Sequence, residues 1–179
     1  TLFGYVSIYN LLTQQEEPRI EFTSNPKSIA FTSSKPLAYV TQKNNTVIPI
    51  DLDAKKARSP INIEKEPGTI AITPDDQWAY VITAESNSVL PIKLSTRKIF
   101  PEIPVGLNPV HLAITPDGNR AYVANFDDKT ITPIDIQTRT ALSPIQLTEK
   151  PSWVAVTPDS KMLCVVHSEA NLVSLISIE

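Results

Sequence analysis

The chain alternates short apolar runs with polar turns along almost its whole length. Residues 68–83, GTIAITPDDQWAYVIT, show the arrangement: an apolar run, a polar turn and a second apolar run. Within the runs, side chains of opposite character or size alternate with a period of two, which is typical of β-strands and not of helices. Prolines recur at intervals that break the chain into short extended pieces. The pattern therefore predicts an all-β protein.

The same pattern occurs four times. The copies lie at residues 30–42, 71–83, 113–125 and 155–167, at steps of 41, 42 and 42 residues. A proline precedes each copy at the same offset, and a third apolar run follows each: NTVIPIDL, NSVLPIKL, KTITPIDI and NLVSLISI. A fourth short run follows in the first three copies. A period of about 40 residues with four strands per unit predicts a β-propeller, in which each repeat forms one blade.

The repeats divide one predicted domain, residues 1–179, into approximate blades at 26–66, 67–108, 109–150 and 151–179. Residues 1–25 are expected to supply strands of a further or closing blade. The third type of strand occurs once more than four blades need, at residues 5–9 and 171–178. A four-bladed ring that closes with one of these copies, a part of a larger propeller, and two chains that complete each other all remain open.

The repeated residues resemble the YVTN β-propeller repeat family, whose pattern runs P-x-x-I-A-I-T-P-D-G, then A-Y-V-T-N, then N-T-V-S-V-I-D. In this chain the motif reads YVTQ, YVIT, YVAN and CVVH. The resemblance implies a surface-layer-like or exported bacterial propeller, periplasmic, at the cell surface or secreted, used for recognition or as the non-catalytic lobe of redox enzymes. Lactonase propellers are distantly similar. Propellers of this family usually have about seven blades, whereas this chain fits four.

Composition changes this picture little. The chain has 41% hydrophobic and 20% charged residues and a net charge of -3, which disfavours a nucleic-acid partner. No apolar run is long enough to span a membrane, so we expect no membrane span. The one cysteine, Cys164, excludes an internal disulfide and a multi-cysteine metal site, and we expect it to be a buried packing residue.

The Thr-Pro-Asp-Gly segment at residues 115–118 raises the question of a small acidic site. Proline presets a turn at its second position, aspartate bonds nearby backbone amides, and glycine tolerates a positive φ. Thr-Pro-Asp occurs in three repeats, and TSSK takes its place in the first. We therefore interpret Asp117 as a turn residue and not as a cation ligand or catalytic carboxylate.

Eight positions are expected to ring the mouth of the central channel, four at the start of the innermost strands and four just after the second strands. They are Ser28, Thr69, His111 and Trp153, with Gln42, Thr83, Asn125 and His167. These positions differ between repeats, whereas the core positions beside them agree. A concave mouth with an aromatic ring and two imidazoles is the default place for a ligand. We expect these residues to bind a protein partner or a small ligand.

The leading hypothesis for function is a non-enzymatic scaffold, monomeric or weakly self-associating, that recognises a partner through these loops. We found no phosphate-binding glycine loop, no GxSxG turn and no paired-cysteine site, so we assign no catalytic residue, no metal and no cofactor. The alternative is a lactonase-like hydrolase at the channel mouth. It would use His111, His167 and a carboxylate of the rim.

Overall fold

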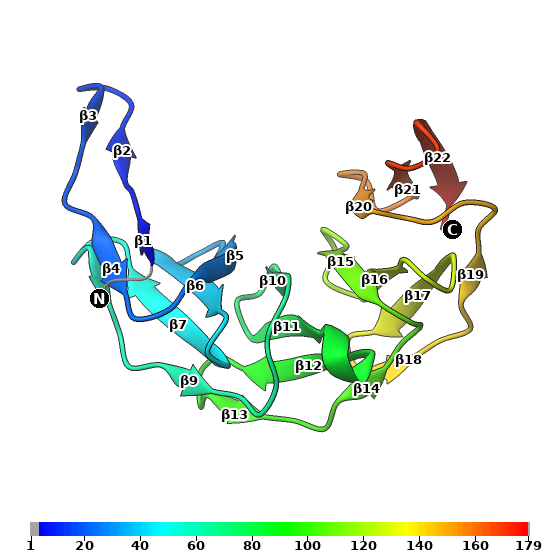
Figure 1. The fold of residues 1–179 in the computed structure, drawn as a ribbon, viewed down its shortest axis with the longest axis horizontal. Coiled ribbons are helices and arrows are strands. Elements are labelled where there is room, and N and C mark those ends of the chain that lie inside the picture. The colour runs from blue at the N-terminus through cyan, green and yellow to red at the C-terminus, as the bar shows by residue number, and fades with distance from the viewer. Residues whose placement is uncertain (1–3, 179) are drawn as a thin grey trace.

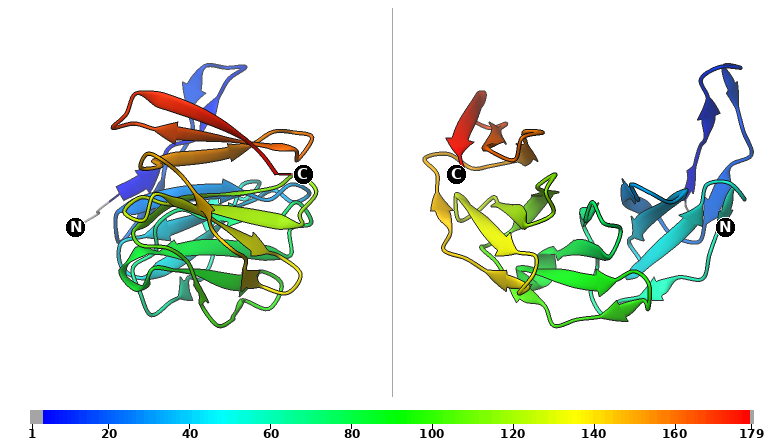
Figure 2. Two further views of the ribbon diagram at one scale, coloured as in Figure 1. Left: turned by 90° about the vertical axis from the view of Figure 1, so that its right-hand side faces the viewer. Right: turned by 180° about the vertical axis from the view of Figure 1, so that it is seen from behind.

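A computed structural model describes residues 4–178, and these form an all-β arrangement of small antiparallel sheets. Among the described residues the one helical segment is a single 3-10 turn, η1 (Ala84–Ser86). The sheets follow one another around an open arc, with the two chain ends at the two ends of the arc (Figure 1). Views from the side and from behind show the same succession (Figure 2).

Three sheets in the middle of the chain share one topology, in which the first four strands pair in sequence order and the fifth pairs with the third. The first sheet contains β5 (Pro26–Phe31), β6 (Leu37–Gln42), β7 (Thr46–Asp51), β8 (Lys56–Ala57) and β9 (Ile61–Asn62). The second contains β10 (Ile70–Ile72), β11 (Trp78–Thr83), β12 (Ser88–Lys93), β13 (Lys98–Ile99) and β14 (Ile103–Pro104). The third contains β15 (Pro109–Ile114), β16 (Arg120–Asn125), β17 (Thr130–Asp135), β18 (Thr140–Ala141) and β19 (Ile145–Gln146).

The ends of the arc are smaller. The fourth sheet has three strands, β20 (Trp153–Val156), β21 (Met162–His167) and β22 (Leu172–Ser177). At the other end β1 (Gly4–Val6) pairs with β4 (Ile20–Phe22), and β2 (Tyr9–Asn10) pairs with β3 (Gln15–Glu16). The strand expected at residues 5–9 is thus divided between β1 and β2. Within residues 4–178 the two ends do not pair, so the four-bladed ring that would close with either copy is not formed.

In the first three repeats the fourth strand is split into two short pieces, and a proline in the third strand explains the split. Pro49 lies in the middle of β7, opposite Tyr39 of β6. Its carbonyl faces the outer strand and accepts a hydrogen bond from Arg58 N at 2.8 Å. Because proline has no N–H, the next bond of the ladder is missing, and the outer strand divides there into β8 and β9. The same occurs at Pro91 and Pro133.

The Thr-Pro-Asp segments are turns, as the sequence indicates. Between β15 and β16, Thr115 Oγ1 donates to Asp117 Oδ1, and the same carboxylate oxygen accepts from Asn119 N at 3.0 Å. Equivalent bonds hold the turns at 73–77 and 157–161. The aspartates satisfy amides of their own turns, so the turn interpretation is confirmed.

Asp76 has an additional role, because it joins the second sheet to the first. Its buried carboxylate accepts hydrogen bonds from Ser33 N at 2.6 Å and from Ser34 N and Oγ at 2.8 and 2.6 Å. The turn at Ser33 and Ser34 belongs to the TSSK segment, which has no aspartate of its own. The second sheet therefore supplies the carboxylate that the first repeat lacks.

The apolar core lies between neighbouring sheets. Val81 and Ile92 of the second sheet pack against Tyr39 and Val47 of the first. On the opposite face of the second sheet, Tyr80 and Val89 pack against the third. The fourth sheet has such a neighbour on one face, and Cys164 in β21 is half-buried. The expectation of a buried packing residue was wrong as to burial, because it assumed a sheet on both sides.

Candidate binding site on the inner strands

The innermost strands β5, β10, β15 and β20 lie side by side on the inner side of the arc (Figure 1). They bring four of the eight expected site residues, Ser28, Thr69, His111 and Trp153, to one pocket of about 340 Å³. These residues hold equivalent positions in successive repeats, so the regular stacking of the sheets places them together.

Three of these side chains also hold the inner strands to one another. Ser28 Oγ accepts a hydrogen bond from the backbone N–H of Ile70 at 3.4 Å. Thr69 Oγ1 donates to the Val110 carbonyl at 3.0 Å. His111 Nδ1 accepts from the N–H of Val154 at 3.4 Å. In each case the bond runs to the next strand of the arc, so these side chains also have a structural role.

Trp153 is the last member of the row, and its side chain is the most available. Its ring stacks on His111, with 3.5 Å between ring centroids and 24° between the planes. The residue is nevertheless 54% exposed. An exposed indole next to hydrogen-bonding groups can take a planar ring by stacking, which contributes about 0.5–1.5 kcal/mol beyond the buried area.

His111 is neutral at physiological pH. Burial lowers its pKa from 6.5 to about 4. Because Nδ1 accepts that bond, Nε2 carries the proton. Ser28 accepts through its oxygen and keeps its own hydroxyl hydrogen. The pocket thus offers two hydrogen-bond donors beside an aromatic surface.

The other four expected site residues are not at a channel mouth. Gln42, Thr83, Asn125 and His167 are fully buried at the ends of their second strands, so their expected place was wrong. They pair within their own sheets: Thr83 with Ser88, Gln42 with Thr46, Asn125 with Thr130 and Thr132, and His167 with Ser174 and the Glu149 carbonyl. In each case the polar side chain bonds to a hydroxyl group on the third strand of its own sheet. The spacing of residues in the sequence could not indicate this pairing.

His111 and His167 do not share a site. Both ring nitrogens of His167 are hydrogen-bonded, one to the Glu149 carbonyl before the fourth sheet at 3.1 Å and one to Ser174 Oγ within it at 2.9 Å. His167 does not line the pocket of His111. Within residues 4–178 no three His, Cys, Asp or Glu side chains gather as a metal site. The same residues contain no helix long and apolar enough to cross a membrane.

Lys27 also lines the pocket, and the sequence interpretation missed it. Its Nζ pairs with Glu66 Oε1 in the loop before the second sheet. Lys27 and Glu66 lie far apart in the chain, and neither is among the residues that recur from repeat to repeat. No pattern in the sequence therefore indicates that they pair. Lys27 brings one paired cation to the edge of the pocket.

No protein-family profile matches the chain, and no curated protein matches it. The chain is similar in structure to the Kuenenia stuttgartiensis hydrazine synthase, with a TM-score of 0.80 and 27% identity over 86% of this chain and 46% of that one. It is also similar to a functionally unknown protein from Desulfotomaculum acetoxidans DSM 771, with a TM-score of 0.79 and 20% identity. That match covers 91% of this chain and 58% of the other. The chain therefore spans about half the length of these structures.

Proposed function

We propose that the chain forms blades of a β-propeller that serves as a non-enzymatic recognition scaffold, with the inner-strand pocket as its binding site. Three observations support the propeller: the repeat of about 42 residues, the succession of similar sheets around an arc, and the two structural likenesses. The activity named for the hydrazine synthase belongs to that protein, and this proposal does not depend on it.

The observation that carries the proposal is the gathering of Ser28, Thr69, His111 and Trp153 in one pocket. The exposed ring of Trp153 favours a planar group, and the hydrogens on Ser28 Oγ and His111 Nε2 favour a hydrogen-bond acceptor on that group. The site fits an aromatic ring that bears a carbonyl or carboxylate, on a small molecule or on a partner protein.

No observation favours the alternative of a lactonase-like hydrolase. That alternative requires His111, His167 and a carboxylate to act together, and His167 is buried in the fourth sheet. His111 has no carboxylate among its hydrogen-bond partners, and burial lowers its pKa to about 4, so it is a weaker base than a free imidazole.

Tryptophan fluorescence tests the proposal, because the chain has only two tryptophans, Trp78 and Trp153. The Trp78→Phe variant leaves Trp153 as the single reporter. We expect benzoate and nicotinamide to quench its emission saturably, and a second change, His111→Ala, to weaken that binding several-fold. Cyclohexanecarboxylate, which lacks the planar ring, is the matched control. Quenching that does not saturate, or that His111→Ala leaves unchanged, would refute the pocket as the binding site.

A further inference from the structure

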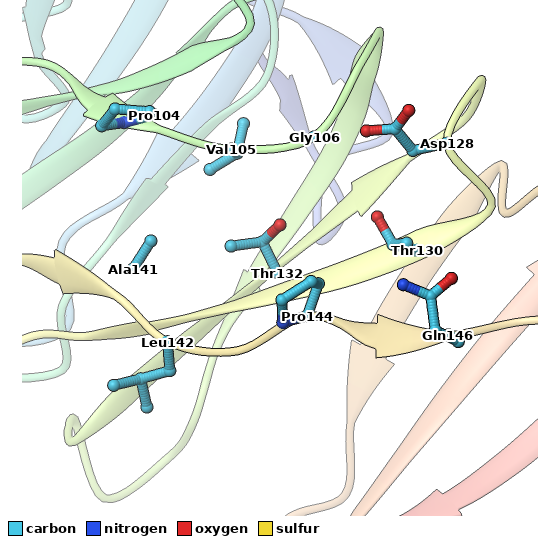
Figure 3. A pocket seen from close by; sticks show the side chains of 10 residues that line it. All are labelled: Pro104, Val105, Gly106, Asp128, Thr130, Thr132, Ala141, Leu142, Pro144 and Gln146. Carbon is cyan, nitrogen blue, oxygen red and sulfur yellow. The ribbon is translucent and has the colours of Figure 1, made fainter.

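A second pocket of about 460 Å³ lies between the outer parts of the second and third sheets. We call it the outer groove. Figure 3 shows the segment from Pro104 to Gly106 on one side and Thr130, Thr132, Pro144 and Gln146 of the third sheet on the other, with Asp128 near Gly106. Every lining residue lies between residues 104 and 146, away from both ends of the arc. The groove therefore does not depend on what lies beyond those ends.

The equivalent groove between the first and second sheets has a different chemistry. Its volume is about 380 Å³, and its lining combines the apolar side chains of Leu90, Ile99 and Phe100 with the ion pair of Lys65 and Glu102, which are 2.8 Å apart. One repeat later Thr132 holds the place of Leu90, and Gly106 holds that of Glu64. Compared with the groove between the first and second sheets, the outer groove thus has a hydroxyl group in place of Leu90 and no side chain in place of Glu64.

Two buried hydroxyl groups of the outer groove have hydrogens to donate. Asn125 Nδ2 donates to Thr130 Oγ1 at 2.9 Å and to Thr132 Oγ1 at 2.8 Å. Both threonines are at least 95% buried. With the Asn125 amide in this orientation, both hydroxyls accept from Nδ2 and neither donates to another described residue, and the reverse orientation would leave Nδ2 unpaired in place of Oδ1. Asn125 Oδ1 is also buried without a partner. Unpaired buried polar groups are costly, and a cluster of them beside a cavity points to a bound ligand.

An acceptor lies in the same groove, near Gly106. Asp128 Oδ2 accepts from Leu107 N at 2.7 Å, which leaves Oδ1 for another donor. Gly106 makes this arrangement possible, because a Cβ there would lie 2.7 Å from both Asn125 Nδ2 and Asp128 Oδ2. The backbone can approach both side chains only with glycine at this position.

We propose that the outer groove binds a saccharide unit. A sugar hydroxyl both donates and accepts, so neighbouring hydroxyls can accept from Thr130 and Thr132 and donate to Asp128. The amide of Gln146 can do either, and the apolar surfaces of Leu142 and Pro144 suit the C–H face of a ring. An anion would be repelled by Asp128, and a single carboxylate provides a poor cage for a divalent cation.

Chemical-shift mapping on the 15N-labelled chain tests this assignment. The probes are N-acetylglucosamine, methyl α-mannopyranoside and methyl β-galactopyranoside, with putrescine as a cationic control. We expect at least one sugar to shift the amides of residues 104–107 and 128–132 saturably. Shifts from none of the three sugars, shifts confined to the inner strands, or a response to putrescine alone would each overturn the proposal.

Two variants identify the groups responsible. Thr132→Val keeps the shape of the side chain and removes one hydroxyl, and we expect it to weaken sugar binding about tenfold. Ala141→Phe should block the groove and abolish the shifts, with Ala141 exposed at its rim. Glu102→Gln, a carboxylate change in the equivalent groove, is the control and should bind as the parent chain does. Unchanged affinity in both Thr132→Val and Ala141→Phe would refute the site.

Discussion

Identical residues at identical repeat positions have different surroundings in the second sheet and at the ends of the arc. Val89 in β12 is fully buried, whereas Val173, its counterpart in β22, is 57% exposed. Ile70 in β10 is 4% exposed, and its counterpart Ile29 in β5 is 41% exposed. The second sheet has a full neighbouring sheet on both faces, whereas the fourth sheet has one neighbour and the far face of the first sheet is covered only by β4 and nearby residues. Position in the arc, and not residue type, decides which apolar side chain becomes core.

The difference also shows where each interaction is placed. Contacts that hold the arc together run between neighbouring sheets: the apolar clusters, the Asp76 carboxylate on the first sheet, and the hydrogen bonds along the inner strands. A repeat architecture of this kind gains stability at each interface between units. The comparison therefore predicts that the same substitution lowers the free energy of unfolding more in a sheet with neighbours on both faces than in a sheet with one incompletely covered face.

The largest contrast is expected between Ile70→Ala and Ile29→Ala. Ile70→Ala removes a buried side chain and leaves a cavity, which should lower the free energy of unfolding by about 3 kcal/mol. Ile29→Ala removes an exposed side chain and should cost less than about 1 kcal/mol. Urea denaturation of the two variants measures both. Equal losses would mean that the face of β5 is covered in solution, and the comparison would fail.

A smaller effect is expected from Asp76→Asn, which weakens the link between the first two sheets. Asparagine tolerates the positive φ of 56° at this position, so the change tests the charge and not the backbone. Hydrogen bonds to a charged group contribute about 1.5–3 kcal/mol, of which we expect asparagine to lose about half. Asp53→Asn is the exposed control and should leave the urea midpoint unchanged.

Asp76 also predicts how that link responds to acid. Burial opposes ionisation of its carboxyl, but hydrogen bonds from Ser34 and Ser33 outweigh burial and lower the pKa below the usual 3.8. A lowered folded pKa means that the contribution is complete above pH 3.8 and is lost as the pH falls through the folded pKa. The difference in stability between Asp76→Asn and the parent chain should therefore shrink below pH 3.8. A constant difference down to the lowest measurable pH would contradict this.

The smallest effect at neutral pH concerns His111, which joins the third sheet to the fourth through its stack on Trp153. Burial lowers its pKa to about 4, so the neutral ring contributes stability above the unfolded value of 6.5. That contribution decreases as the pH falls from 6.5 to about 4. NMR titration of the His111 ring protons should give a midpoint near 4, and Trp153→Ala, which opens the site to water, should raise it. A midpoint near 6.5 in the parent chain would contradict the buried stack.

Much of the fold follows from the printed residues. The repeated pattern predicts where the strands lie and that the Thr-Pro-Asp segments form turns. Both could be predicted because strand period and turn chemistry are local properties. The candidate site was predicted less well. Ser28, Thr69, His111 and Trp153 share a pocket, but Gln42 and Asn125, which the same logic placed beside them, are buried. One residue of register decides which face a strand side chain takes, and spacing alone does not fix that register.

The sequence by itself determined the unit: short strands, their order, their turns and their repetition at about 42 residues. Only the tertiary structure decided how units meet. It made Asp76 the carboxylate of another repeat's turn, left Val173 exposed where Val89 is buried, and set Gly106 against Asn125 and Asp128 in the outer groove. Burial and hydrogen bonding between sheets depend on contacts between residues about one repeat apart. No local sequence pattern specifies which sheet will pack against a given face of another sheet.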